Sequence, residues 1–232
     1  MRRILVFCLL LGLVILGWLN WPGVTSRPQP RQAAVPTIVK QPVNFASRTF
    51  DPLNPPSDMP PLNSGENAEC VSDFGSNANV GGQTLRTDAT HATLTVTQVS
   101  VTLLLNITIW VPTDVTPRVI EHEEGHRQIS EYYYQTADKL AAQIAANYVG
   151  KQVEITGTDL NAASMEALKQ MGAEITDEYV RELNPDPTQL LYDSITDHSR
   201  NGVAAQDAVD HALKNISIES PQSASPEPSN PQ

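Results

Sequence analysis

The chain has 232 residues, of which 40% are hydrophobic and 18% are charged, a length that suits one compact domain with flanking segments. Its 15 Lys and Arg residues against 26 Asp and Glu residues give a formal net charge of −11. An acidic chain without a basic stripe is unsuited to the phosphate backbone, so nucleic acid is excluded as a partner. Only two cysteines are present, Cys8 and Cys70, so a metal site must be built from histidines and carboxylates.

The N-terminus has the pattern of an export signal. Two arginines precede an uncharged apolar run of residues 4–19, which predicts translocation of the rest of the chain to the periplasm or the extracellular space. Trp18 and Trp21 favour an inner-membrane anchor over residues 4–21, whereas small residues at positions 24–26 favour cleavage by a signal peptidase. Both alternatives stay open. Membrane contact is expected only through this segment.

The chain is predicted to have four parts. Residues 1–21 form the signal or membrane anchor, 22–65 a proline-rich linker, 66–215 the folded domain, and 216–232 a disordered tail rich in serine and proline. Ten of the 18 prolines lie between positions 22 and 61, which favours an extended spacer. The alternative is that some of this segment forms edge strands of the domain.

Within the domain, strands precede helices. The β-branched run at residues 93–101 alternates with a period of two, and residues 103–111 form a second, more apolar strand, so we expect a small antiparallel sheet. Helical periodicity follows from Pro117 to a stop at Gly150, and again over residues 160–183 and 203–214. Strands followed by helices predict an α+β domain.

The first predicted helix contains the motif His122-Glu123-Glu124-Gly125-His126. Residues four apart lie on the same helix face, so both imidazoles can bind one zinc ion, and a third protein ligand leaves a position for water. Glu123 can then act as the general base toward that water. The motif predicts a zincin-like arrangement, with His122 and His126 as metal ligands and Glu123 as the catalytic base.

The third ligand must come from elsewhere in the chain. The candidates are the histidines and acids of the strand region, the second helix and the segment after it: His91, Glu174, Glu178, Glu182, Asp193, Asp197 and His198. Both a carboxylate on a later helix and a more distant histidine are known in zinc sites, so the residues alone leave this choice open.

Two motifs together resemble a known family. His122-Glu123-x-x-His126 and Tyr192-Asp193-Ser194-Ile195-Thr196-Asp197-His198 are similar to the DUF922 family of bacterial secreted proteins, which are described as zinc-dependent proteases. The family usually has glycine directly after the late histidine, whereas this chain has Ser199 and a glycine only at Gly202.

The resemblance implies that His198 is the third zinc ligand. Asp193 would then orient an imidazole, or would be the ligand itself in place of His198. Tyr192 would donate a hydrogen bond to the oxyanion of the reaction, with a packing role as the alternative.

These features predict an exported zinc metallopeptidase, a hydrolase whose substrates are peptides or proteins. One alternative is a non-catalytic binding domain of the cell envelope in which zinc is structural or absent. Another is a zinc amidase that acts on peptidoglycan cross-links. A fourth protein ligand, such as Asp193 or Glu178, would favour the structural role, since catalytic zinc sites keep one position open.

Overall fold

The computed structural model describes residues 35–62 and 65–219, without the side chains of 216–219. The predicted signal or anchor over residues 1–21 lies outside the described residues, as does most of the predicted tail. Within the described part of the chain, no helix combines the length and the apolar character needed to cross a membrane.

The sheet is organised around one long central strand, β4 (His91–Pro112). Strand β3 (Glu69–Arg86) pairs with β4 antiparallel over nearly its whole length. Along the opposite edge of β4 lie β5 (Gln152–Thr156), which is antiparallel, and then β1 (Thr37–Lys40) and β2 (Asn44–Phe50), which are parallel. The α+β class is confirmed. The expectation of an antiparallel sheet is wrong. Strands β1 and β2 run parallel to β4 along the edge opposite β3, so the sheet is mixed.

Strands β1 and β2 lie inside the segment expected to be a proline-rich linker. They fit there because Pro36, Pro42 and Pro52 fall just outside the two strands, where a missing backbone N–H removes no ladder hydrogen bond. The linker interpretation therefore does not hold for residues 37–50, and the edge-strand alternative describes them.

Strand β4 also replaces the two separate strands that the sequence predicts at residues 93–101 and 103–111. Nothing between these runs can turn the chain, since only Thr102 separates them. The buried positions shift from even to odd numbers after Val96, and a bulge accounts for this shift: Gly82 pairs with Val96 while Gly81 pairs with Gln98. The strand thereby keeps its apolar side chains on one face throughout.

Five helices follow in the described part of the chain, and they depart from the prediction at three places. The helix expected from Pro117 to Gly150 is divided at Thr136 into α1 (Pro117–Gln135) and α2 (Ala137–Ala146). Helix α3 (Leu160–Leu183) has the predicted bounds, with Asp159 capping its N-terminus through the backbone N–H groups of residues 161 and 162. Helix α4 (Asp186–Thr196) was not predicted, and α5 (Ala205–Glu219) extends the predicted third helix into residues assigned to the tail.

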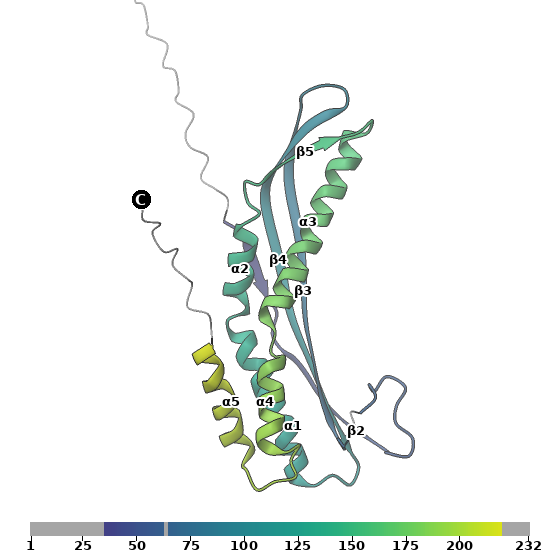
Figure 1. Ribbon diagram of the computed structural model, residues 1–232. Coiled ribbons are helices and arrows are strands. Elements are labelled where there is room, and N and C mark those ends of the chain that lie inside the picture. The colour runs from purple at the N-terminus through teal and green to yellow at the C-terminus, as the bar shows by residue number, and fades with distance from the viewer. Residues whose placement is uncertain (1–34, 63–64, 220–232) are drawn as a thin grey trace, which may run out of the picture. The chain divides into compact units, whose positions relative to one another are not determined.

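The core lies between the sheet and the first three helices (Figure 1). Side chains from alternate positions of β4, including Leu103 and Leu105, pack against Ile144 of α2 and Ile175 of α3. A second, smaller cluster joins α4 and α5 to α1 through Ile129 and Tyr192, among others. Helix α1 is therefore held on one side by the sheet and on the other by α4 and α5.

We expect Leu103→Ala to lower the free energy of unfolding by about 3 kcal/mol, because it leaves a cavity in the core. Leu103 is fully buried, whereas Leu85 on β3 is 72% exposed, so Leu85→Ala is the matched control and should cost under about 1 kcal/mol. Urea denaturation followed by circular dichroism measures both. Equal losses in the two variants would contradict this placement of the core.

Candidate metal centre

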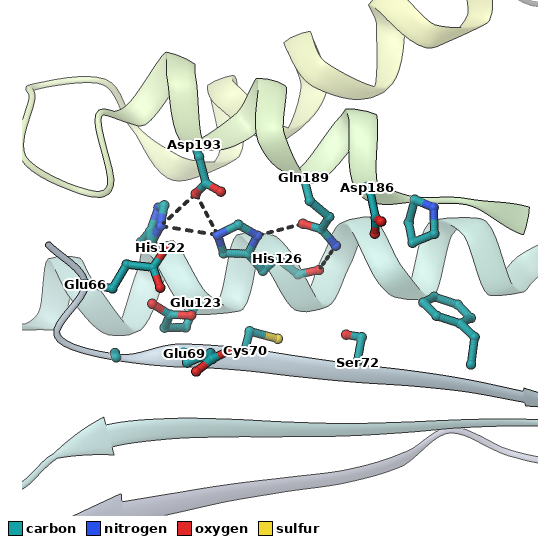
Figure 2. A pocket seen from close by; sticks show the side chains of 13 residues that line it. Glu66, Glu69, Cys70, Ser72, His122, Glu123, His126, Asp186, Gln189 and Asp193 are labelled. Carbon is teal, nitrogen blue, oxygen red and sulfur yellow. Dashed lines mark hydrogen bonds and ion pairs between the residues drawn. The ribbon is translucent and has the colours of Figure 1, made fainter. Parts of the chain in front are cut away.

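Helices α1 and α4 bring three potential metal ligands together (Figure 2). His122 and His126 are one turn apart on the face of α1 that meets α4, and Asp193 points toward them from α4. Both imidazoles are largely buried, with side-chain exposures of 7% and 14%, and the Asp193 side chain is 16% exposed. Within the described residues, this is the one group of three or more His, Cys, Asp and Glu residues with metal-binding spacing.

The spacing of the three ligand atoms fits a tetrahedral ion. The two histidine Nε2 atoms are 3.3 Å apart, and Asp193 Oδ1 lies 3.3 Å from His122 Nε2 and 2.9 Å from His126 Nε2. Ligands about 2.0 to 2.1 Å from a tetrahedral zinc ion are separated by about 3.3 to 3.4 Å. The triangle therefore has the dimensions of three ligands around one zinc ion.

A second set of residues fixes the His126 ring. Its Nδ1 donates a hydrogen bond to Gln189 Oε1 at 2.6 Å, while Gln189 Nε2 donates to the His126 carbonyl and to Ser130 Oγ. Because the Gln189 oxygen can only accept, the proton of the imidazole is on Nδ1, and Nε2 presents a lone pair.

The His122 ring is fixed in the same way by Thr196. The Thr196 hydroxyl lies 3.3 Å from His122 Nδ1 and donates its own proton to the Tyr192 carbonyl at 2.9 Å, so it accepts a hydrogen bond from the imidazole. Both imidazoles thus turn their Nε2 atoms toward the same point, where Asp193 Oδ1 also lies. A cation shared by the three atoms, either a metal ion or the proton of an imidazolium, joins them there.

Asp193 is adapted to carry a negative charge at this position. Burial raises the pKa of its carboxyl group, but the imidazoles of His122 and His126 outweigh this effect and hold the pKa below its ordinary range. Its Oδ1 atom is buried and lies 2.9 Å from His126 Nε2, with which it forms an ion pair when the imidazole is protonated. A metal ion bound to both atoms would replace that proton.

Glu123 lies at the edge of the same pocket and is only 5% exposed. Desolvation raises the pKa of its carboxyl group to about 7; the charge of His126 opposes this increase, and the charges of Glu66, Asp193 and Glu69 add to it. A carboxyl group with a pKa near neutrality can both accept and return a proton at the pH of most compartments. The general-base role of Glu123 stays a prediction.

Gly125, inside the motif, permits the contact between the two helices. A Cβ atom at this position would overlap the hydroxyl and ring of Tyr192. Tyr192 is fully buried, its ring is stacked on His122, and its hydroxyl donates a hydrogen bond to the His122 carbonyl at 3.0 Å. The burial of Tyr192 and its bonded hydroxyl favour the packing alternative over the predicted contact with an oxyanion.

The structure places His198 beside the triad but outside it. Its Nδ1 lies 3.7 Å from Asp193 Oδ1, and its ring centroid lies 6.5 Å from that of His122. His198 follows the end of α4 in a run of three residues with positive φ, from Asp197 to Ser199 (49°, 50° and 65°). This left-handed run turns the chain away from the axis of α4, so Asp193, which lies on the helix, is the closer ligand.

The remaining third-ligand candidates lie elsewhere. Glu174 and Glu178 on α3 interact with Tyr148, and His91 pairs with Asp88 at the tip of the β3–β4 hairpin. Asp197 pairs with Arg200. Glu182 pairs with Arg181 on α3.

Sequence reasoning missed Gln189 and Thr196, the residues that orient the two imidazoles. A signal was present, since Gln189, Tyr192, Asp193 and Thr196 have the i, i+3, i+4, i+7 spacing of one helix face, and Pro187 lies in the first turn of α4. No helix was predicted over residues 186–196, so the helix face that these four residues share was not recognised.

No family model matches the chain, and neither a curated protein nor a solved structure matches it. The function must therefore be inferred from the geometry of this site.

We expect Gly125→Ala to weaken zinc binding by about tenfold or more, because α4 must move away from α1 and carry Asp193 with it. Gly202→Ala is the matched control, since a Cβ atom at position 202 meets no atom within 4 Å. Zinc affinity measured by competition with a chromogenic chelator tests this. Unchanged affinity in Gly125→Ala would show that the close approach of the helices does not control the site.

Proposed function

We propose that the chain is an exported zinc-dependent metallopeptidase, with His122, His126 and Asp193 as the zinc ligands and Glu123 as the general base. The observation that carries the proposal is the convergence of three ligand atoms at tetrahedral spacing, with each imidazole Nδ1 bonded to Gln189 or Thr196 so that Nε2 faces the other ligands. Export is supported by the arginines and the apolar run of the N-terminus.

The chemistry follows from the positions of these groups. A zinc ion bound here supplies a Lewis acid that activates water and polarises a peptide carbonyl group. The Glu123 carboxylate takes up the proton from the attacking water and delivers it to the leaving amine. Gln189 and Thr196 keep the imidazoles in place, so little reorganisation is needed when substrate binds.

Two further observations support a relationship to the DUF922 family. The two motifs that carry the resemblance, on α1 and at the end of α4, meet in one site. Ser199, at the position where the family usually has glycine, has φ of 65°, a conformation that glycine adopts without strain. The left-handed backbone that a glycine would provide is therefore present with a serine.

A non-catalytic zinc site is the second candidate, and His198 is the observation that favours it. Its Nδ1 is buried without a hydrogen-bond partner in the described residues, and it lies 3.7 Å from Asp193 Oδ1. If His198 moved inward as a fourth protein ligand, it would close the position that water needs in a catalytic site.

We expect the full chain to bind about one zinc ion, and His126→Ala and Asp193→Ala to lose it, because each removes one of three protein ligands. His198→Ala should keep its zinc, as should the control His211→Ala, which alters an exposed histidine on α5. Plasma mass spectrometry after dialysis measures the metal, and circular dichroism checks folding. If His198→Ala lost its zinc and Asp193→Ala kept it, His198 and not Asp193 would be the third protein ligand.

We expect Glu123→Gln to bind zinc as the parent does but to cleave substrate about 10²- to 10⁴-fold more slowly, because the amide cannot accept the proton. Fluorescein-labelled casein and a pool of quenched fluorescent peptides are suitable probes. Glu124→Gln, on the same turn but paired with Arg127, is the matched control and should keep its activity. Equal cleavage by Glu123→Gln and the parent would exclude Glu123 as the base.

A further inference from the structure

A chain of buried hydroxyl groups connects the sheet to His126, one of the proposed zinc ligands. Ser130 on α1 is fully buried, and its Oγ lies 2.8 Å from Ser72 Oγ on β3 and 3.0 Å from Gln189 Nε2 on α4. The same Oγ lies 3.1 Å from the His126 carbonyl, one turn earlier in the helix. Ser130 is therefore the residue at which hydrogen bonds from β3 and α4 meet on α1.

The chemistry of these groups fixes the direction of each hydrogen bond. A carbonyl group can only accept, so the Ser130 hydroxyl donates its proton to the His126 carbonyl. The two lone pairs of Ser130 Oγ then accept one proton from the Gln189 amide and one from the Ser72 hydroxyl. The buried Ser130 hydroxyl thus uses its one donor and both of its acceptor positions.

This arrangement determines which way the Gln189 amide faces (Figure 2). Its Nε2 donates to Ser130 Oγ and, at 3.2 Å, to the His126 carbonyl, while its Oε1 lies 2.6 Å from His126 Nδ1. In a reversed amide, Oε1 would face these two acceptors, which carries the cost of unpaired buried polar groups. The reversed amide would also take the acceptor away from the imidazole.

We infer that Ser130 and Ser72 are positioning residues of the metal centre, which act by holding the Gln189 amide with its oxygen toward His126. The inference rests on the proposed role of His126 as a zinc ligand and names what controls the orientation of that ligand. With Gln189 Oε1 in this place, the imidazole keeps a proton on Nδ1 and directs Nε2 at the other ligand atoms.

A second pair of hydroxyl groups between β3 and a helix has the same pattern away from the site. Thr84 on β3 donates to Ser164 Oγ on α3 at 3.0 Å. Ser164 is 5% exposed and donates to the Leu160 carbonyl, one turn earlier, at 2.7 Å. Because Ser164 makes the same bonds to its own helix and to β3 as Ser130 does, Ser164→Ala is the matched control for Ser130→Ala.

Nuclear magnetic resonance of the metal-free, ¹⁵N-labelled full chain tests the inference without metal or activity. We expect the proton on His126 Nδ1 to be protected from exchange with water in the parent and in Ser164→Ala. In Ser130→Ala the Gln189 amide loses an acceptor and its fixed orientation, so this proton should exchange faster. The proton on His122 Nδ1 should not change. Equal exchange of the His126 proton in the parent and in Ser130→Ala would overturn the inference.

Zinc affinity, measured by competition with a chromogenic chelator, tests the consequence for the metal. We expect Ser130→Ala to bind zinc about tenfold more weakly than the parent, because the partner of a ligating histidine loses its support. Ser164→Ala should bind zinc as the parent does. The double variant Ser130→Ala/Gln189→Ala should bind zinc no more weakly than Gln189→Ala alone, because Ser130 acts through Gln189. Additive losses would show a general effect on the fold and would overturn the inference.

The two measurements separate this inference from the proposed function. If the parent bound no zinc, the proposed metal centre would fail, while exchange of the His126 Nδ1 proton would still decide whether Ser130 orients Gln189. Full zinc affinity in Ser130→Ala would contradict the inference alone. Circular dichroism checks folding, and Ser72→Ala, which alters the half-buried end of the hydroxyl chain, gives the same test if Ser130→Ala does not fold.

Discussion

The close contact between α1 and α4 is the constraint on which the site depends. Gly125 has no side chain, so the ring of Tyr192 lies directly against α1, and its hydroxyl is bonded to the His122 carbonyl. This contact sets both the distance and the rotation of α4. Asp193, the next residue, is consequently within 3.3 Å of both histidine Nε2 atoms. A bulkier residue at position 125 would separate the ligands even if all three were retained.

The site concentrates polar and charged groups away from water, which is costly in a folded protein. Three atoms, His122 Nε2, His126 Nε2 and Asp193 Oδ1, face one point, and the buried carboxyl group of Glu123 lies in the same pocket. The surrounding contacts hold this arrangement: Gln189 and Thr196 fix the rings, and the core against β4 fixes α1. Such an arrangement is expected where binding of a cation offsets the cost.

Local patterns in the sequence gave correct predictions for features that depend on one helix alone. The bounds of α3 follow from its periodicity and the Asp159 cap, and the helical motif correctly places His122 and His126 on one face. Local patterns gave wrong predictions where contacts between distant parts of the chain determine the structure. The prolines around residues 37–50 suggested a spacer, but these strands form because β4 offers a free edge. Strand β4 stays continuous because a bulge opposite Gly81 and Gly82 keeps its apolar side chains on one face. This bulge depends on the pairing of β4 with β3, which the local pattern does not contain.

The sequence by itself determined the chemistry available: two imidazoles at helical spacing, an acid between them, and a later segment with a carboxylate and a histidine as the remaining ligand candidates. The tertiary structure decided which of these is used. Asp193 and His198 are five residues apart, and only the docking of α4 brings the former into the triad. The left-handed run from Asp197 to Ser199 places His198 beside it. The physical reason is that helical periodicity is a local property, whereas the approach of two helices depends on packing between residues about 70 positions apart.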